Sequence, residues 1–226
     1  QAGDTVMAGW NRVAGTYNAQ GQIVMNVCTE DYQTKSGTVI EADHVNSNAL
    51  EALCSGDAQK TIVIPAGSVV ELMNVVHPGS NTTIIADGAT LIMNEAHKGI
   101  LANRPKAVNY QSLQNVRIQG GTWKLRNETD SCSVFRFSHG SDLVIDGVTI
   151  VSNYESHAIA LVAMKDATVQ NCMLQVQGRK NSNSVEEALQ IDVATPKTAP
   201  ALVQFGSRYV QGQTCKNIRI LNNTIE

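Results

Sequence analysis

Three carboxylates stand close together in the segment EEALQID, residues 186–192. They are Glu186, Glu187 and Asp192. Hydrolysis of a glycosidic bond uses a pair of carboxyl groups: one protonates the leaving oxygen, and the other acts as a nucleophile or activates water. Glu187 is the candidate for proton transfer, and Asp192 is the candidate for the partner that stays ionised. The segment therefore supplies candidate carboxyl pairs for acid/base chemistry of this kind.

The segment that carries these carboxylates aligns with two earlier apolar runs. VFRFS (134–138), AIALV (158–162) and ALQID (188–192) all alternate large apolar residues with other types, as a strand with one buried face does. Phe135, Ile159 and Leu189 share one inward position, and Phe137, Leu161 and Ile191 share the next. The outward columns across adjacent strands are Val134, Ala158 and Ala188; Arg136, Ala160 and Gln190; and Ser138, Val162 and Asp192.

This register predicts an open trough that could hold a sugar ring. Ala158 and Ala160 form its low floor, and Arg136 and Gln190 flank the floor as donors of hydrogen bonds to the sugar. Adjacent strands lie about 4.8 Å apart, so His157 comes within reach of Glu187 and joins the candidate catalytic residues. Arg136 and Gln190 are the candidate substrate-binding residues.

Each of these residues also has a structural explanation. Asp192 fits a solvated position at a strand end, and the two glutamates and His157 fit ordinary turn positions. Arg136 would then form a surface ion pair with Asp130 or Glu155, which contributes little to stability. The choice between the chemical and the structural interpretation depends on how the chain positions these side chains.

The elements that position them follow from an internal repeat. IQGGTW (118–123), IDGVTI (145–150), VQNCML (169–174) and ILNNTI (220–225) share one pattern, and their first residues are 27, 24 and 51 residues apart. A weaker copy, ADGATL (86–91), begins 32 residues before the first of them, and IPAG (64–67) begins 22 residues earlier still. A period in the twenties indicates a solenoid. Short Val-, Ile- and Thr-rich strands at this spacing favour a parallel β-helix, with Trp123 in the core.

Two insertions interrupt the regular spacing. Residues 177–185 are polar and lead directly into EEALQID, and residues 194–213 contain Phe205, Arg208 and Tyr209. Long loops on a solenoid often lie beside the binding face. The sequence therefore adds Phe205, Arg208 and Tyr209 to the candidate sugar contacts, although packing of the loop onto the coil is an alternative role for the two aromatic residues.

The helix candidate SNALEALC (47–54), the strand that follows it, IPAG, and the regular coils resemble the entry to the right-handed parallel β-helix superfamily, which includes pectate lyases and polygalacturonases. The resemblance covers residues 46–226 and implies a right-handed solenoid with a short N-terminal capping helix, acting on polysaccharides. It also implies that catalytic carboxylates lie on or just before the sheet, where Glu186, Glu187 and Asp192 fall. The paired-aspartate and Arg-Ile-Lys motifs of polygalacturonases are absent, and Asp142, Asp146 and Asp166 are not clustered as in a pectate lyase calcium site.

The ends of the chain carry further expectations. Residues 1–45 are expected to form a segment that packs on the main body, and residues 46–226 the β-helix. The last repeat is followed only by Glu226. Because solenoids need terminal caps, we expect either a continuation of the native protein or a second polypeptide that completes the stack.

Composition excludes several function classes. With 17 Lys and Arg, a net charge of −3 and no basic run, nucleic acid is not an expected partner. No stretch is long and apolar enough to predict a membrane span. The five cysteines form no CxxC pair, and Cys172 is expected to be a small buried residue. We expect no metal and no cofactor.

These observations favour a secreted or cell-surface carbohydrate-active protein, with a glycoside hydrolase as the leading hypothesis and an oligo- or polysaccharide as the partner. A noncatalytic glycan-binding adhesin is the alternative, in which the same trough binds sugar without an acid/base pair. A polysaccharide lyase is a third alternative.

Overall fold

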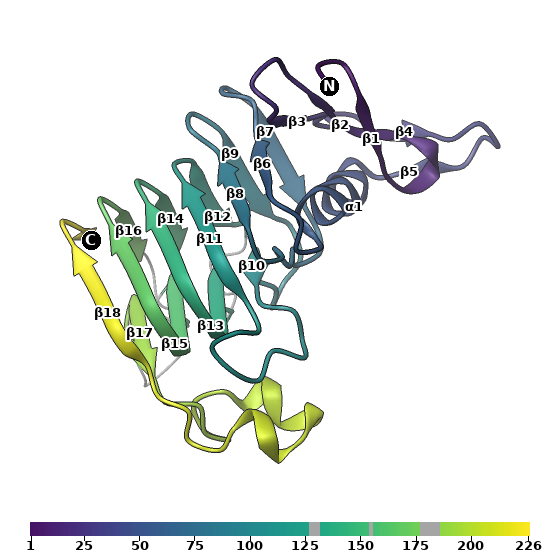
Figure 1. Ribbon diagram of the computed structural model, residues 1–226. Helices are drawn as coiled ribbons and strands as arrows, with labels where there is room; N and C mark the ends of the chain where they lie inside the picture. Colours follow the sequence, from purple (N-terminus) through teal and green to yellow (C-terminus); the bar gives the residue numbers. More distant parts are fainter. Residues whose placement is uncertain (127–131, 154–155, 177–185) are drawn as a thin grey trace.

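The computed structural model describes residues 1–126, 132–153, 156–176 and 186–226. Short strands dominate this part of the chain, and most of them belong to two parallel sheets (Figure 1). From β6 onwards the chain passes back and forth between the two sheets, so strands that are distant in sequence become hydrogen-bonded neighbours. The protein is therefore mostly β with parallel sheets, as expected.

The larger sheet contains the strands that would carry the site. In spatial order it comprises β1 (Thr5–Met7), β2 (Val13–Tyr17), β3 (Ile23–Met25), β6 (Lys60–Val63), β8 (Thr82–Ile85), β11 (Gln114–Gln119), β13 (Phe135–Asp146), β15 (Ile159–Gln170) and β17 (Leu189–Asp192). Two more strands join it at the side, β10 (Leu101–Ala102) on β13 and β18 (Lys216–Leu221) on β15.

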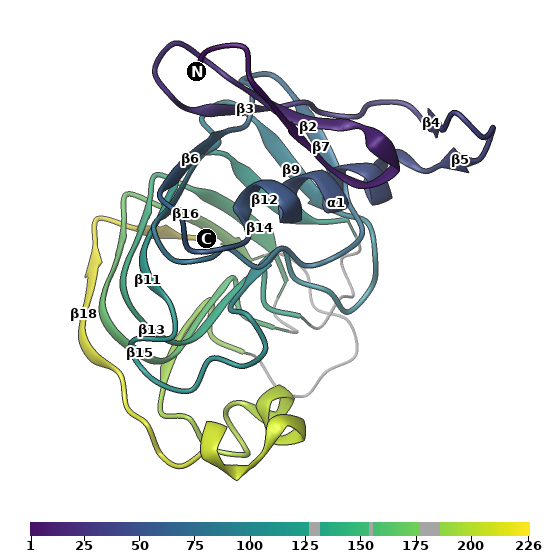
Figure 2. The same cartoon turned by 45° about the vertical axis from the view of Figure 1, so that its right-hand side comes forward.

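The second sheet is built from the strand that follows each repeat turn. Its order is β19 (Thr224–Ile225), β16 (Met173–Val176), β14 (Thr149–Ser152), β12 (Thr122–Leu125), β9 (Thr90–Met93) and β7 (Val69–Leu72). Figure 2 shows the strands of both sheets stacked in the same order. The short remaining pieces are the β4 (Tyr32–Gln33) and β5 (Val39–Ile40) hairpin and three 3-10 turns, η1 (Gly9–Asn11), η2 (Pro200–Phe205) and η3 (Ser207–Tyr209).

The repeat predicts the register of these sheets. Ile118 pairs with Ile145, Ile145 with Val169, and Val169 with Ile220, as the spacing requires. The third motif residue has a positive φ in every copy, which explains why it is Gly or Asn; these residues are Gly120, Gly147, Asn171 and Asn222. ADGATL aligns only in its second half, because Thr90 pairs with Thr122 but Ile84, not Ala86, pairs with Ile118.

The two longest strands bend, and this bend separates the candidate site from the repeat turns. β13 and β15 each contain two residues with positive φ, namely His139 and Asp142 in β13 and Ala163 and Asp166 in β15. Before the bend, β13 pairs with β10 and with the first part of β15; after it, β13 pairs with β11. Asp142 and Asp166 thus occupy equivalent bends.

One apolar core runs between the sheets. Trp123 is fully buried, as expected, and its ring meets Phe135 edge to face with centroids 5.0 Å apart. Cys172 is also buried, and burial raises the pKa of its thiol. Cys28, Cys54 and Cys215 are free thiols as well.

The N-terminal region joins this core through a helix and a strand. β3 pairs in parallel with β6, and α1 (Ala42–Cys54) packs on β7 and buries Leu50 and Leu53 in the core. The sequence pattern places the start of this helix at Ser47, but α1 begins five residues earlier, at Ala42. Asn46 and Ser47 therefore lie inside α1 and do not cap it. Asn46 bonds the backbone of Cys28, and Ser47 accepts hydrogen bonds from the backbone of a neighbouring loop.

Candidate functional site

The predicted strand register of the candidate site is confirmed. Arg136 pairs with Ala160 and Ala160 with Gln190, while Val162 pairs with Asp192. The inward position of Ile191 is less enclosed than expected, with 44% of its surface exposed, because in the described chain β17 pairs on one side only, with β15. Strand pairing therefore brings the predicted columns together as the sequence indicates.

The floor of the predicted trough is closed, however. Ala158, Ala160 and Val162 are all buried, with at most 1% of their surfaces exposed. Val162 packs in a small apolar cluster with Ala194 and Ala199 from the insertion 194–213. The expectation of an open floor along these alanines is wrong, because Ala158 belongs to the main core, Ala160 is buried, and the insertion covers Val162.

The insertion is fixed by one buried hydrogen bond. Nε2 of His139 lies 2.7 Å from the carbonyl oxygen of Tyr209, and His139 itself is fully buried. Burial lowers the pKa of His139, which favours the neutral imidazole as donor to that carbonyl. Tyr209 is only 5% exposed and packs against Phe205 and under the guanidinium of Arg208. The structure thus places Tyr209 in a packing position and Phe205 on the surface.

A cavity of about 200 Å³ lies where the insertion meets the outward face of β10, β13 and β15. We call it the arginine cavity. Its polar lining consists of His77, Asn103, Arg104, Arg136, Ser138, Thr198 and Gln204, and its apolar lining of Val75, Ala102, Pro105, Ala107, Val162, Ala199, Ala201, Leu202 and Phe205. Among the described residues no Asp or Glu lines it. Arg136 and Phe205 are therefore brought together, but without the candidate carboxylates.

Arg136 is exposed at the edge of this cavity. Asp130 and Glu155, the ion-pair partners considered for it, lie outside the described residues. Gln190 and Arg208 are not part of the lining. Phe205 is 37% exposed and lines the cavity.

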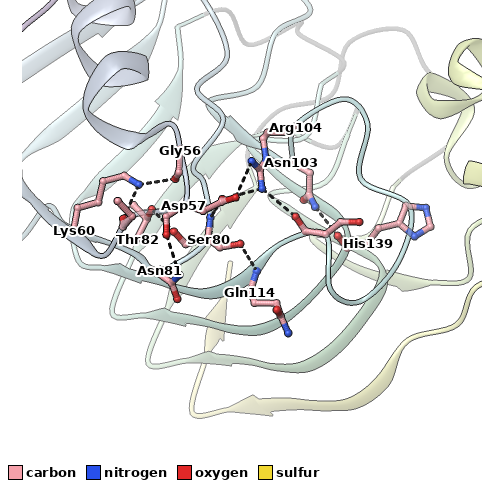
Figure 3. Close-up of polar contacts among 12 residues, drawn as sticks. Gly56, Asp57, Lys60, Ser80, Asn81, Thr82, Asn103, Arg104, Gln114 and His139 are labelled. Atoms are coloured by element: carbon pink, nitrogen blue, oxygen red, sulfur yellow. Dashed lines mark hydrogen bonds and ion pairs between the residues drawn. The ribbon is translucent and has the colours of Figure 1, made fainter.

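Arg104 was missed by the sequence analysis, and a polar network holds it in place (Figure 3). Its guanidinium lies 3.0 Å from a carboxylate oxygen of Asp57 and donates to the carbonyl of Ser112. A hydrogen bond from the backbone N–H of Ser80, assisted by Arg104, lowers the pKa of Asp57. The 32-residue gap before the repeat at Ile118, longer than the 27 and 24 that follow, was the available signal of an extra loop here.

Asn103, beside Arg104, ties this loop to β13. Its side-chain oxygen accepts a hydrogen bond from the backbone N–H of Ser138, and its amide donates to the carbonyl of His139 (Figure 3). The same loop contacts the segment after the insertion, because the hydroxyl of Tyr110 donates to the carbonyl of Thr214. The cavity walls are thus linked to each other and to the strands.

A second hollow of about 550 Å³ shares a wall with the arginine cavity. Val75 and His77 line both, and Glu51 lines the second hollow only. Glu51 accepts a hydrogen bond from the backbone N–H of His77 and faces its ring at 3.3 Å.

The predicted carboxylates gather elsewhere, at the start of β15 and β17. His157 is buried, and its Nδ1 lies 2.6 Å from the backbone carbonyl oxygen of Glu187. The carboxylate of Glu186 lies 3.8 Å from Nε2, and that of Glu187, with its side chain 71% exposed, lies 3.7 Å from Nδ1. We call these three residues the His157 cluster.

Asp192 does not join this cluster. It lies at the end of β17, where it accepts hydrogen bonds from the backbone N–H of Val193 and the side chain of Gln190. Five residues of extended chain separate it from Glu187, or about 16 Å between Cα atoms. The carboxyl groups of glycoside hydrolases lie roughly 5–9.5 Å apart, a spacing that Glu187 and Asp192 reach only if both side chains turn towards each other along the strand.

No known family model matches the chain. No curated protein matches it either. Among solved structures it is similar to PfbA, a surface adhesin of Streptococcus pneumoniae, with a TM-score of 0.55 and 17% identity over 78% of this chain and 44% of that one. The chain thus spans less than half of PfbA's length, and the likeness concerns the fold alone.

A weaker similarity connects the chain with a protein from Parabacteroides merdae ATCC 43184 that is provisionally described as a glycosyl hydrolase. The TM-score is 0.43 and the identity 12%, over 74% of this chain and 83% of that one. Likeness at this level carries no functional argument. In the described part of the chain, no helix combines the length and apolarity needed to cross a membrane.

Proposed function

We propose that the chain is a secreted or cell-surface protein that binds glycans, and that the arginine cavity is its glycan-binding site. The observation that carries the proposal is the lining of the cavity: two guanidinium groups, amide and hydroxyl side chains, an apolar floor and one exposed aromatic ring. Binding sites for small molecules commonly combine an apolar surface with a few convergent polar groups.

The proposal includes the architecture that presents this cavity. We propose a right-handed parallel β-helix over residues 46–226, with residues 1–45 packed on it and α1 as its N-terminal cap. The passage of the chain between two parallel sheets, the bends of β13 and β15 and the register of successive repeats support this architecture. The rigid strands then hold Arg136 and Ser138 in fixed positions below the two loops.

The chemistry of the lining fits a sugar. A guanidinium donates paired hydrogen bonds to vicinal hydroxyl oxygens or to a carboxylate, and Arg136 is placed to do this from the strand. Arg104 is already oriented by Asp57. The volume, smaller than the roughly 300–1,000 Å³ of sites for drug-sized ligands, fits a single sugar residue, with further units reaching the second hollow.

The experiment is a binding screen of the protein against a panel of oligosaccharides, followed by calorimetry of the best ligand with the wild type, Arg136→Ala and Arg208→Ala. We expect Arg136→Ala to weaken binding by about 1.5–3 kcal/mol, the value of a hydrogen bond to a charged group. Arg208→Ala is the matched control, because Arg208 packs on Tyr209 outside the lining. Equal affinities for all three proteins would reject the cavity as the glycan site.

Hydrolysis is the second candidate, and one observation favours it. The carboxylate of Glu186 lies near Nε2 of His157, and the carboxylate of Glu187 lies near Nδ1. One N or O atom from each of the three residues lies within 4.8 Å of the other two. Carboxyl groups this close are compatible with a pair in which one group transfers a proton. A hydrolysis assay on the same oligosaccharides, with Glu186→Gln and Glu187→Gln alongside, tests it. Activity that both substitutions leave unchanged would reject these two residues as catalytic.

A further inference from the structure

The His157 cluster is formed by two successive turns of the chain. His157 lies just before β15, and Glu186 and Glu187 lie just before β17. The backbone N–H of Ala158 donates to the carbonyl of Ala188 over 2.8 Å, which sets the two turns side by side. The imidazole and the two carboxylates thus meet through regular strand pairing and not through chance contact of long loops.

The hydrogen bond of His157 determines which ring nitrogen has a lone pair. Nδ1 lies 2.6 Å from the carbonyl oxygen of Glu187, and a carbonyl can only accept, so Nδ1 carries the proton. In the neutral ring Nε2 is then an unprotonated acceptor. Nε2 faces the carboxylate of Glu186 at 3.8 Å, which is too long for a hydrogen bond. Since His157 is 9% exposed, the ring is held in this orientation.

We infer that His157, Glu186 and Glu187 form a binding site for a divalent transition-metal ion of the Zn²⁺ type. Histidine ligands of metals usually donate their other N–H to a backbone carbonyl or a carboxylate, as His157 does to Glu187. Tetrahedral ligation with bonds of about 2.0–2.1 Å places neighbouring ligand atoms about 3.3 Å apart. Nε2 and the Glu186 oxygen, at 3.8 Å, need to approach by only a small movement.

The third ligand is mobile enough to complete the site. The side chain of Glu187 is 71% exposed, and its carboxylate lies 3.7 Å from Nδ1, within a group of three donor atoms, one per residue, that are all within 4.8 Å of one another. Rotation of this exposed side chain would bring the carboxylate to the Nε2 side of the ring. Water would fill the remaining position, as in sites with three protein ligands. One imidazole and two carboxylates suit Zn²⁺ better than Ca²⁺, which takes six to eight oxygen ligands. The bound ion would link the turn before β15 to the turn before β17.

The test is calorimetric titration of the untagged, chelator-treated protein with ZnCl₂, for the wild type, Glu186→Gln, Glu187→Gln and Glu186→His. Glu30→Gln is the control, because Glu30 is an exposed glutamate of the N-terminal region. Circular dichroism checks that each variant is folded. Glu186 and Glu187 are partly or largely exposed, so their amides should not disturb the core.

We expect one ion per chain in the wild type and in Glu30→Gln. Each amide variant should lose at least the roughly 10–100-fold in affinity that loss of an outer-shell partner costs. Glu186→His should retain binding, because imidazole is itself a Zn²⁺ ligand, whereas a merely electrostatic attraction would be lost with the charge. The inference is overturned if the wild type binds no Zn²⁺ or binds Ca²⁺ in its place. It is also overturned if all the proteins bind Zn²⁺ equally, because the ion would then be bound elsewhere, by cysteine thiols.

Discussion

The arginine cavity lies over β10, β13 and β15, whereas the His157 cluster lies in the turns just before β15 and β17. The cavity is concave and apolar at its floor, and in the described chain its lining carries cationic, amide and hydroxyl groups without a carboxylate. The His157 cluster has two carboxylates around one buried imidazole. From His157 to Val162 the strand covers about 16 Å.

This difference separates recognition from acid/base chemistry. A glycoside hydrolase needs its two carboxyl groups on either side of the bond that is cleaved, and therefore inside the surface that binds the sugar. Here the groups suited to hold a sugar and the groups suited to transfer a proton are in different places. The comparison favours binding at the cavity and ion binding at the cluster, and four predictions can break or sharpen it.

The largest expected effect comes from filling the cavity. Ala201 lies in its wall on the insertion and is partly exposed, so Ala201→Trp adds an indole to the space without entering the core. We expect a loss of glycan affinity of more than about 100-fold, or about 2.7 kcal/mol, with Zn²⁺ binding unchanged. Calorimetry with both ligands measures this. Ala96→Trp, at an exposed site outside the lining, is the control; retained glycan affinity in Ala201→Trp would place the sugar elsewhere.

A smaller effect is expected from the aromatic residue of the wall. Phe205→Ala removes the one aromatic ring of the described lining, and we expect roughly tenfold weaker glycan binding, about 1.4 kcal/mol. Val203→Ala is the matched control, because Val203 is 47% exposed on the same turn, η2, but does not line the cavity. If Val203→Ala weakens binding as much as Phe205→Ala, the effect comes from the stability of the turn and not from contact with the sugar.

The sequence predicts those features of the two regions that the repeat spacing determines, and it does not predict those that depend on single long-range contacts. Strand register repeats, so the pairing of Ile118 with Ile145 and of Arg136 with Ala160 can be predicted from spacing, and the Gly or Asn at each turn follows from its positive φ. The closed floor cannot be predicted in this way. Val162 is covered by an insertion outside the repeat, and Arg104 is oriented by Asp57, 47 residues away, through a contact that no periodicity encodes.

The third prediction concerns His139, which anchors the insertion that forms the cavity wall. Burial lowers the pKa of His139 below its usual 6.5, so the unfolded state binds a proton more readily than the folded state. Stability from this residue is therefore complete above pH 6.5 and is lost as the pH falls from 6.5 towards the lowered pKa. The positive φ of 66° at this position is tolerated by Asn, which makes His139→Asn a suitable variant.

Urea unfolding of the wild type and His139→Asn at several pH values between 7.5 and 5 checks this prediction. Because other titrating groups are common to both proteins, the difference between their free energies of unfolding reports on His139. We expect the wild type to be more stable at pH 7.5 and the difference to shrink below pH 6.5. A difference that stays constant or grows on acidification would contradict a neutral, buried His139.

The smallest effect is expected from the residues with which the sequence interpretation began. Glu187→Gln and Asp192→Asn keep the size of each side chain and remove its charge, and neither residue lines the arginine cavity. Both should bind the glycan within about twofold of the wild type, since surface electrostatic contributions of this kind rarely exceed about 1 kcal/mol. Only Glu187→Gln should weaken Zn²⁺ binding, because Asp192 lies about 16 Å along the strand from the cluster. If instead both substitutions reduce glycan affinity strongly, the sugar must extend along β17 past both carboxylates. Sugar binding and acid/base chemistry would then share one surface.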